Sequence, residues 1–528
     1  MTEPKEKNKL GQYFTPPHIA RLMVGMLSSP VGLPVLEPSS GTGVFLDALF
    51  EAGYRDVLGI EIDEGLAHHK HFDVENTSFV SWQPTRRFAA VIGNPPYIRW
   101  KNLEEEQRNE ISTSQHWGTL FNSLSDYLNV FIVNAVDTLA DEGELIFITP
   151  SFWLHTQHAE GLRTYLMQNG AITHLISFGE AQVFDGVSSS IIIFKFVKTK
   201  TPPLSISHFR FVGPRRVSAE LDNIENEAFV AETIPQFEPG RHWTLASSED
   251  QDELRRLQNW CNTTSATLPG VDPDGYDTLG DYCTIANGMV SGLDKAFRVG
   301  GDLLERLTDK EVSALIQVVK GSDLTQLVTF RTSRYIDIPI GLTETEVRAT
   351  YPNLIAHLET YKDQLSKRYS YGRDLPFWEW AFRRSETFLC NDTKKIFVPC
   401  KERITNKTLV RFSLVPSGSV ATQDVTAFAP KEGIDISVEY ICAYLSLEEV
   451  TRWIRMRGLI KGGVAEFSER PLASIPFRAI DRSSEADRDN YRKIVQLMKS
   501  CTSPADVQEV RNSVREIFVE MGLPERLT

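Results

Sequence analysis

The sequence predicts an α/β protein: a doubly wound, mostly parallel sheet of seven strands, followed by a region of mixed α+β structure. Three observations favour this fold. Apolar strand candidates alternate with helical stretches from Leu10 to about Phe196, which is typical of βα units that place helices on both faces of one sheet. Motif-like residues cluster just after the strand candidates, where ligands bind such Rossmann-like sheets. From about Thr244 onward the alternation is lost, and short β-rich pieces mix with helices.

An amphipathic helix is the first element expected along the chain, within Leu10–Leu27. Thr15 can cap this helix with Pro16 at the first helical position, and the apolar residues that follow recur at helical spacing. Helices are also expected at Gly43–Ala52 and Asp126–Ala140. The strand candidates are Pro34–Leu36, Val57–Ile62, Ser78–Trp82, Phe88–Ile92, Glu144–Thr149, Ile172–Phe178 and Ser190–Phe196.

These elements predict four parts of the chain. Residues 1–200 form the sheet domain, which ends near the prolines of Thr199–Pro203, and residues 201–243 form a connecting segment. Residues 244–475 form the α+β region, in which β pieces at Lys395–Pro399 and Thr408–Val415 precede a helix over Val438–Arg457. Residues 476–528 form a helical segment.

Composition places the chain among ordinary globular proteins, with 41% hydrophobic and 24% charged residues. No run approaches 18 uncharged apolar residues and the amino terminus is polar, so we expect neither a membrane span nor a secretory signal. The six cysteines are scattered without C-x-x-C spacing, so we expect buried free thiols in a reducing cytoplasm rather than disulfides or zinc ligands. No metal site is predicted.

A small-residue turn follows the first strand candidate. The strand ends in Glu37, and the turn Pro38-Ser39-Ser40-Gly41-Thr42-Gly43 then opens a helix whose free N–H groups a ligand can approach closely. A second acid, Glu61, lies 24 residues further on at the end of the next strand, the position that hydrogen-bonds ribose hydroxyls in nucleoside-binding folds. The acidic turn and the lack of a Walker-type lysine favour a cationic nucleoside such as a sulfonium over a pyrophosphate.

The tetrapeptide Asn94-Pro95-Pro96-Tyr97 follows the strand candidate Phe88–Ile92. It suits methyl transfer to an exocyclic amino group, whose lone pair is delocalised into the base ring. The amide oxygen of Asn94 and the carbonyl of Pro95, held by two prolines, can both accept from the NH2 group and localise that lone pair. Tyr97 supplies a flat surface for the base. A proline-rich turn after a strand is the simpler alternative.

Taken in this order, the residues resemble the gamma class of DNA adenine-N6 methyltransferases, whose motif is NPPY and most of which belong to type II restriction–modification systems. The family order is a TPP-type motif, a glycine-rich S-adenosylmethionine loop, an acid after the second strand, NPPY, and a target-recognition region. The segments that match are Thr15–Pro17, Glu37–Gly43, Glu61 and Asn94–Tyr97. In addition, Val183–Val187 resembles a later aromatic motif of the family, and Asp126–Phe131 falls where the family contacts the adenine of the cofactor.

The resemblance implies a role for each matching residue. Asn94, Pro95 and Tyr97 are expected to be catalytic, with Tyr97 and Phe184 stacking on the two faces of a base flipped out of the duplex. The residues expected to bind S-adenosylmethionine are Thr15, Glu37, Ser39, Gly41, Gly43, Glu61, Asp126 and Phe131. Relatives often place an aspartate on the third strand, and that position falls near Ser78 or Phe79 here, so either a serine takes its place or the interaction is missing.

Target recognition is expected in residues 244–475. The stretches Ala286–Phe297 and Leu459–Gly463 look like stretches that recur in the recognition regions of such enzymes, although ordinary turns also explain their glycines. A net charge of −14 argues against a protein that coats nucleic acid by bulk electrostatics. From Lys367 to Arg411, however, eleven Lys/Arg stand against five Asp/Glu, interleaved with aromatic residues. We expect phosphate contacts from Arg383, Arg384, Lys394 and Lys395, while charge alone fits a solvated surface equally well.

The expected protein is therefore a cytoplasmic enzyme that methylates adenine N6 in a short sequence of double-stranded DNA. A cognate restriction endonuclease would share this target without needing to bind the chain. Three alternatives stay open. Protein-glutamine methyltransferases also use NPPY but are usually much shorter. A fused restriction–modification enzyme would carry a nuclease region ahead of Leu10, which only nine residues precede. A catalytically inactive DNA-specificity subunit would have little reason to hold Glu37, Glu61 and NPPY.

Overall fold

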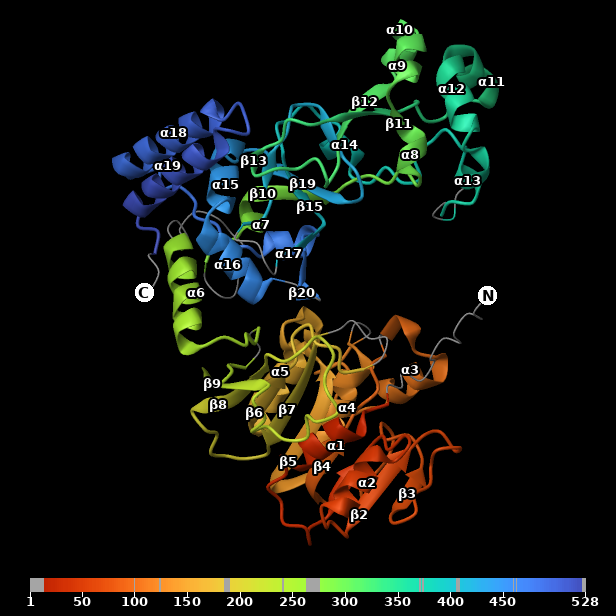
Figure 1. Cartoon of the computed structure of the whole chain (residues 1–528), viewed down its shortest axis with the longest axis vertical. Helices are drawn as coiled ribbons and strands as arrows, with labels where there is room; N and C mark the ends of the chain where they lie inside the picture. Colours follow the sequence, from red (N-terminus) through yellow and green to blue (C-terminus); the bar gives the residue numbers. More distant parts are fainter. Residues whose placement is uncertain are drawn as a thin grey trace. The chain divides into compact units, whose positions relative to one another are not determined.

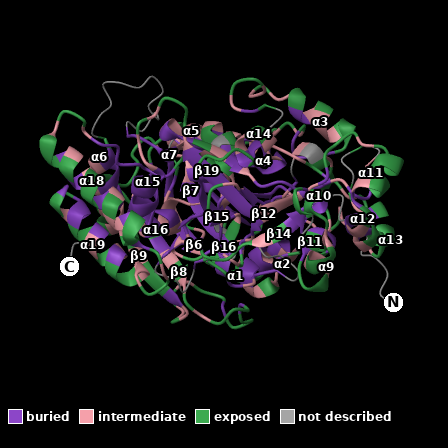
Figure 2. Ribbon diagram, turned by 90° about the horizontal axis from the view of Figure 1, so that it is seen from above, coloured by how far each residue is buried: buried purple, intermediate pink, exposed green. Residues whose placement is uncertain are grey.

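The computed structural model describes residues 14–98, 100–122, 125–184, 190–239, 242–262, 276–369, 372, 375–404, 409–458, 460–461 and 463–524. The chain divides into two compact units, Met1–Gln251 and Asp252–Thr528 (Figure 1), and each is described by itself. Buried residues gather in the interior of each unit, while exposed residues lie on outer helices such as α18 and α19 and on connecting turns (Figure 2).

The first unit contains a nine-stranded sheet in the order β3-β2-β1-β4-β5-β7-β6-β8-β9. All neighbours pair in parallel except at β7, which is antiparallel to both β5 and β6, and at β9, which is antiparallel to β8. The strands are β1 (Val35–Glu37), β2 (Val57–Glu61), β3 (Asp73–Asn76), β4 (Phe88–Gly93), β5 (Leu139–Pro150), β6 (Ala171–Ser177), β7 (Ile191–Val197), β8 (Ser205–Phe211) and β9 (Phe229–Pro235).

Helices cover both faces of this sheet, so the expected doubly wound α/β fold is confirmed. Ile19 and Leu46, from the first two helices, belong to one buried core, while Val133 and Leu162 belong to the core on the opposite face. The helices are α1 (Pro17–Val24), α2 (Val44–Glu51), α3 (Glu105–Ser112), α4 (Tyr127–Thr138) and α5 (Glu160–Asn169), with short 3-10 turns at Trp100–Asn102, Ser151–Leu154 and Gln157–Ala159. The helix α6 (Ser248–Cys261) spans the unit boundary.

The sheet differs from the expectation at both of its edges. The third strand is Asp73–Asn76 rather than Ser78–Trp82; it pairs only with β2 and is largely exposed, so it needs no apolar run. Phe79 and Val80 are buried from the turn that follows. At the other edge, residues 201–243 were expected to connect two domains, but they carry β8 and β9, which extend the sheet beyond seven strands. The first unit consequently runs to Gln251.

The helix α1 begins one residue later than expected. Pro16 occupies the N-cap position and Pro17 the first turn, so Thr15 does not cap the helix. The hydroxyl of Thr15 instead accepts a hydrogen bond from Asn94, described below. The reason is local: two successive prolines remove two N–H donors from the first turn, so a capping side chain has fewer partners there.

The second unit is built from three small sheets and helices of mixed length, as expected of an α+β region. The sheet orders are β10-β19-β15-β17-β13, β11-β14-β12-β18 and β16-β21-β20. The strands are β10 (Cys283–Asn287), β11 (Arg298–Val299), β12 (Leu315–Val319), β13 (Leu327–Val328), β14 (Ser333–Ile336), β15 (Ile396–Pro399), β16 (Lys401–Arg403), β17 (Ser413–Leu414), β18 (Ser419–Ala421), β19 (Val425–Pro430), β20 (Ile460–Lys461) and β21 (Val464–Glu466).

The helix expected over Val438–Arg457 is two helices, α15 and α16, because Leu447 adopts an extended conformation between them. The helices of this unit are α7 (Leu279–Tyr282), α8 (Asp294–Phe297), α9 (Asp302–Arg306), α10 (Asp309–Val312), α11 (Glu344–Thr350), α12 (Pro352–Glu359), α13 (Lys362–Ser366), α14 (Glu386–Leu389), α15 (Val438–Leu445), α16 (Glu448–Arg457), α17 (Glu469–Ala473), α18 (Glu485–Ser500) and α19 (Val507–Glu520).

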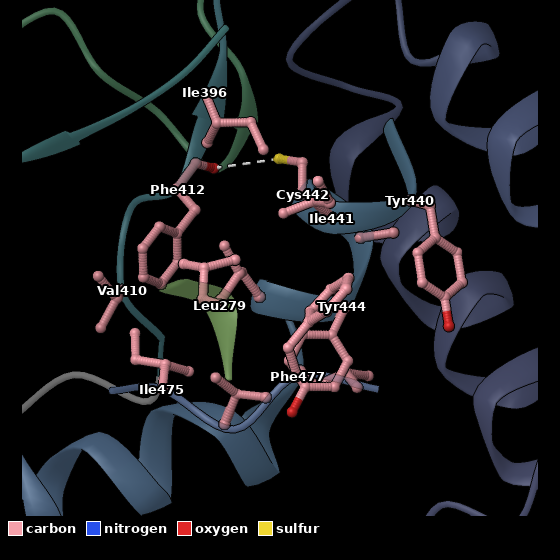
Figure 3. Close-up of a cluster of buried hydrophobic side chains, with 14 of the residues drawn as sticks. Leu279, Ile396, Val410, Phe412, Tyr440, Ile441, Cys442, Tyr444, Ile475 and Phe477 are labelled. Carbon is pink, nitrogen blue, oxygen red and sulfur yellow. Dashed lines mark hydrogen bonds between the residues drawn. The ribbon is translucent and has the colours of Figure 1, made fainter. Parts of the chain in front are cut away.

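One hydrophobic core joins the second unit's main sheet to its carboxyl-terminal helices. Figure 3 shows its centre, where Tyr440 and Tyr444 of α15 lie beside Phe477 and where the Cys442 thiol donates to the Phe412 carbonyl at 3.7 Å. Ile494 of α18 and Phe518 of α19 belong to the same core. The segment 476–528, expected to be a separate helical part, therefore packs as part of the second unit.

The cysteines are free thiols. Cys261, Cys283, Cys442 and Cys501 are buried, Cys400 is half-buried and Cys390 is exposed. Among the described residues, no helix is long and apolar enough to cross a membrane. Within that same part of the chain, no three His, Cys, Asp or Glu side chains lie close enough together to hold a metal ion.

Candidate active site

A pocket opens at the carboxyl ends of β1, β2 and β4 in the first unit. It is a concave site, as small-molecule sites are, and its lining combines apolar side chains with a few polar groups. Three segments predicted from the sequence meet there: the turn after β1, the acid that ends β2, and the Asn-Pro-Pro turn after β4. The lining residues are Phe14, Thr15, Glu37–Thr42, Val44, Phe45, Glu61, Ile62, Thr77–Phe79, Asn94–Pro96, Ile98, Gln107, Tyr127 and Phe131.

The glycine-rich turn owes its shape to two left-handed glycines. Gly41 has φ 51° and Gly43, which precedes the first turn of α2, has φ 79°. A side chain at Gly43 would also meet the ring of His69 at 3.0 Å. The N–H of Gly41 donates to Oε2 of Glu61 at 2.7 Å, so the turn after β1 is tied to the end of β2. The two motifs predicted separately from the sequence therefore form one rigid wall of the pocket.

Two carboxylates lie in this wall. Glu61 is buried and its Oε1 accepts from the N–H of Asp63 at 2.9 Å, so both of its oxygens are held by backbone donors. Glu37 is only 1% exposed, and its Oε2 has no hydrogen-bond partner among the described residues. Burial, and then the nearby charge of Glu61, raise the pKa of Glu37 well above its ordinary value. A positively charged ligand would compensate both effects.

The far end of the pocket is apolar. The rings of Phe79 and Phe131 lie 4.8 Å apart, and Tyr127 lies 5.9 Å from Phe131. Ile62, which directly follows Glu61 and is 47% exposed, also lines the pocket. Burial raises the pKa of the Tyr127 hydroxyl. This end has the flat apolar surfaces that bind a purine ring beside a ribose held at Glu61.

Of the residues expected to bind the cofactor adenine, Phe131 lines the pocket and Asp126 does not. Asp126 is the N-cap residue of α4, one position before Tyr127. Tyr127 also lines the pocket; it lies within the matching stretch Asp126–Phe131 but was not among the expected cofactor residues, although its spacing of four residues from Phe131 places both on one helix face. Ser78 and Phe79, the two positions near which the resemblance places an acid of the third strand, both line the pocket shortly after β3. Gly43 is absent from the lining and shapes the turn instead.

Asn94 lies at the rim of the pocket, held on three sides. Its Nδ2 donates to Thr15 Oγ1 at 3.0 Å, and its backbone carbonyl accepts from Ser39 Oγ at 3.1 Å. The hydroxyl of Tyr97 donates to the Ile148 carbonyl at 2.7 Å and is also hydrogen-bonded to Asn94 Oδ1. The side-chain amide of Asn94 is therefore fixed by Thr15 and Tyr97, and its backbone by Ser39 of the glycine-rich turn.

The two aromatic residues expected to stack on the base do not line this pocket. Tyr97 is half-buried against the core of the α4 face, with its hydroxyl directed to Asn94. Phe184 is 3% exposed and packs in the opposite core together with Phe178. The residues that follow it, 185–189, lie outside the described residues. In this conformation the structure does not bring Phe184 to the site.

The four cations expected to contact phosphate are largely engaged within the second unit. Arg383 forms ion pairs with Asp337 and Glu386, and Lys394 pairs with Glu439 at 2.6 Å. Lys395 is 1% exposed; burial lowers its pKa, and its ammonium donates to the carbonyls of Asn391 and Thr393. Arg384 donates from Nε to the Gly288 carbonyl.

These contacts correct the expectation for Arg383, whose side chain is 11% exposed, and for the buried Lys395. The expectation for Lys394, whose side chain is 44% exposed, stays a prediction. At Arg383 and Lys395 the positive charge compensates internal carboxylates and carbonyls. Of the interleaved aromatic residues, Phe377, Trp378 and Trp380 are buried, while Phe382 is 38% and Tyr369 74% exposed.

Comparisons with known proteins agree with the pocket. The family model described as Eco57I restriction-modification methylase matches residues 48–184. The type II methyltransferase M.HindII of Haemophilus influenzae is 39% identical over 501 residues, which cover 94% of this chain and 95% of that protein. The type II methyltransferase M.HincII, also of Haemophilus influenzae, is 37% identical with the same coverage of both chains.

Among solved structures, the type IIL restriction–modification enzyme MmeI, determined in complex with DNA, matches with a TM-score of 0.63 at 13% identity. The match covers 97% of this chain and 73% of that one, so the same succession of folds extends over both units.

Proposed function

The chain belongs to the type II DNA methyltransferases of restriction–modification systems, and from that premise we propose that it methylates the N6 amino group of adenine within a short duplex sequence. Methylation of DNA with S-adenosylmethionine follows from the family; the choice of adenine N6 is the proposal. The observation that carries it is the Asn94-Pro95-Pro96-Tyr97 turn at the rim of the pocket, with the Asn94 amide fixed by Thr15 and Tyr97.

The pocket fits S-adenosylmethionine, which would supply a methyl group on a positively charged sulfur. The unpartnered Oε2 of Glu37, buried beside Glu61, favours a cation there. Glu61 would accept from the ribose hydroxyls, and Phe79 and Phe131 would enclose the adenine ring of the cofactor. The turn of Ser39 and Gly41 places the backbone close to the ligand.

Asn94 and Pro95 would hold the target amine. An amide oxygen and a backbone carbonyl that both accept from one NH2 group draw its lone pair out of the base ring, which makes the nitrogen a better nucleophile. The amine loses its proton after attack, so no strong general base is required. Because Asn94 is already fixed, orientation of the amine supplies much of the rate.

The target adenine must leave the duplex to reach Asn94, at a cost of roughly a few kcal/mol. Tyr97 stays our candidate for one stacking face and Phe184 for the other. Phe184 would have to leave its present core position to act in this way, so its assignment depends on a rearrangement when DNA binds.

Two further parts of the proposal concern the cell. A cognate restriction endonuclease would cut the same sequence when it is unmethylated, which would give the methyl group its protective role. The chain would act in the cytoplasm, where its DNA and its cofactor are found.

The test is the chemical identity and position of the methyl group in DNA from cells that express the chain. Mass spectrometry of the nucleosides should show N6-methyladenine, and sequencing of modified bases should place it within one short sequence. The same cells expressing Asn94→Ala serve as the control and should lack the mark. A methylated cytosine, or methylated glutamine in proteins with unmodified DNA, would refute the assignment to adenine N6.

A further inference from the structure

The loop between β2 and β3 folds back onto the glycine-rich turn of the pocket. Three of the chain's eleven histidines, His68, His69 and His71, lie in this loop. The side chain of His69 is 6% exposed, and its ring lies parallel to the ring of Phe72 with the centroids 5.7 Å apart. Among the described residues these histidines form no metal-binding group, so the burial of the His69 ring needs another explanation.

The ring of His69 occupies the space that a side chain at Gly43 would need. A Cβ atom added to Gly43 would lie 3.0 Å from Cδ2 of His69. Gly43 directly precedes α2, and its carbonyl accepts from the N–H of Asp47 in the first turn of that helix at 2.9 Å. The end of the glycine-rich turn is therefore packed between the His69 ring and the start of α2.

The two nitrogens of the His69 ring have different partners. Nδ1 accepts a hydrogen bond from the backbone N–H of His71 at 3.3 Å, so the proton of the neutral ring is on Nε2. Nε2 donates to Oδ1 of Asp47 at 3.2 Å, and the ammonium of Lys70 lies 3.2 Å from the same oxygen. Because both nitrogens have partners, the orientation of the ring is fixed as well as its position.

These contacts join the β2–β3 loop to the turn and to α2 at two points. At the first point the carboxylate of Glu61 accepts from the N–H of Gly41. At the second, His69 packs on Gly43 and donates to Asp47. Loop, turn and helix thus form a closed ring of contacts behind the wall of the pocket.

We propose that His69 is a positioning residue for S-adenosylmethionine, which holds the glycine-rich turn and the Glu61 carboxylate in the arrangement that binds the cofactor. His69 does not line the pocket, so it acts on the cofactor through the turn. A turn already held in its binding conformation loses less conformational entropy when the ligand binds, which raises the affinity. The inference rests on S-adenosylmethionine being the cofactor and is independent of which base is methylated.

The deciding experiment is a calorimetric titration of the full chain with S-adenosylmethionine. His69→Phe keeps a ring against Gly43 but has no nitrogen, so the Kd should rise by about ten-fold, as expected for an effect passed on through one contact. His69→Gln places an amide N–H near the position of Nε2 and should keep the Kd within about two-fold. At saturating cofactor kcat should be unchanged in both variants, because the bound ligand then holds the turn in place.

Hydrogen exchange tests the same contact without cofactor. The N–H of Gly41, which donates to Glu61, should exchange faster in His69→Phe than in the unmodified chain and should be restored in His69→Gln. The matched control is His68→Phe, the same substitution at the exposed preceding position. This control should change neither the exchange rate nor the Kd.

Asp47→Ala removes the same hydrogen bond from the other side. Its side chain is 47% exposed, so this variant keeps the test decisive if His69→Phe is poorly folded. Asp47→Ala should also raise the Kd by about ten-fold. The double variant of both residues should bind no more weakly than the weaker single variant, because the two substitutions remove one shared contact.

Three results would each overturn the proposal: an unchanged Kd in the single variants, a Kd as high in His69→Gln as in His69→Phe, or single effects that multiply in the double variant. The second result would show that the ring shape matters and the hydrogen bond to Asp47 does not. A finding that the chain methylates a base other than adenine would leave all of these measurements unaffected, so the two proposals fail separately.

Discussion

Asn94 is the residue on which the proposed chemistry depends most directly. Replacement by Ala removes the amide oxygen while leaving the cofactor wall of Glu37, Gly41 and Glu61 intact, so kcat should fall by at least about 100-fold, the effect of removing one preorganised polar group. Single-turnover methylation checks the rate, and titrations with DNA and S-adenosylmethionine check that both still bind. A variant that kept most of its rate would show that the amine is activated by other groups.

The raised pKa of Glu37 should affect both the stability of the folded chain and its affinity for the cofactor. An acid whose pKa is higher in the folded chain than in the unfolded chain lowers the free energy of unfolding when the pH is above its pKa in the unfolded chain. At a pH below that pKa the acid is protonated in both states and has no such effect. Glu37→Gln removes the ionisation, so the variant without ligand should have a higher Tm than the unmodified chain at pH 8. The difference should shrink as the pH falls toward the ordinary pKa of a glutamic acid.

The affinity for the cofactor should rise with pH, whereas the stability contributed by Glu37 falls with pH. A cationic ligand prefers the ionised carboxyl, so the affinity of the unmodified chain for S-adenosylmethionine should rise with pH through the raised pKa, and that rise should be lost in Glu37→Gln. Calorimetric titrations over the same pH range test this. If both proteins showed the same pH dependence, Glu37 would not face the cationic part of the cofactor.

Residue types and their spacing predicted those site residues whose contacts form within one turn or between neighbouring strands of the sheet. Glu37, Gly41, Glu61 and Asn94 meet in one pocket because parallel strands bring their carboxyl ends to the same edge. Lys395 was misassigned for a different reason. A sequence shows that a cation is present, but whether it points to solvent or to a carbonyl is decided by packing that no local pattern records.

At the scale of elements, a buried ion pair holds the end of the amino-terminal segment against the sheet. Lys195 of β7 and Glu144 of β5 lie 2.6 Å apart with side chains 5% and 4% exposed. Lys195 also donates to the Met26 carbonyl and to Ser28 Oγ, while Glu144 accepts from the N–H groups of Ser28 and Ser29. The pair thus fixes the chain that runs from α1 into β1.

Breaking this pair from one side leaves an uncompensated buried charge. Lys195→Met should lower the free energy of unfolding by about 3–5 kcal/mol. Combining it with Glu144→Gln should recover part of that loss, because the isolated charge is gone. Urea denaturation of the two single variants and the double variant provides the measurement. If the double variant lost as much as the two single variants added together, the residues would act independently and not as a pair.

Central and edge elements of the sheet differed in how well they could be predicted. The strand β4 and the second half of β5 are buried and contain mostly apolar residues, so they were predicted near their observed positions. The first residues of β5, among them the exposed Asp141 and Glu142, were missed, and the expected helix ran to Ala140. β3 and β8 lie near the edges, where polar residues such as Asp73 and Ser207 meet solvent and the apolar signal is weak. The break at Leu447 was missed because both flanking helices continue the same apolar pattern.

At the scale of the whole molecule, the division into two units sets where target recognition can be exchanged between relatives. The first unit holds the complete cofactor pocket and Asn94, so the choice of DNA sequence is expected in the second. The core of the second unit extends from Leu254 of α6 to Phe518 of α19. An exchange limited to residues 244–475 would cut through this core and leave α18 and α19 against a foreign α15 surface.

A junction between Ala246 and Ser247 avoids that cut, since Trp243 packs in the first unit and α6 begins at Ser248. A chimera that takes everything from Ser247 onward from a relative of different specificity should fold and should methylate the relative's sequence. Its affinity for S-adenosylmethionine should remain that of this chain. Sequencing of modified bases in cells expressing the chimera gives the answer. A folded chimera that still marked the original sequence would place base recognition in the first unit, where Tyr97 and the segment between β4 and α4 would then be the residues to examine.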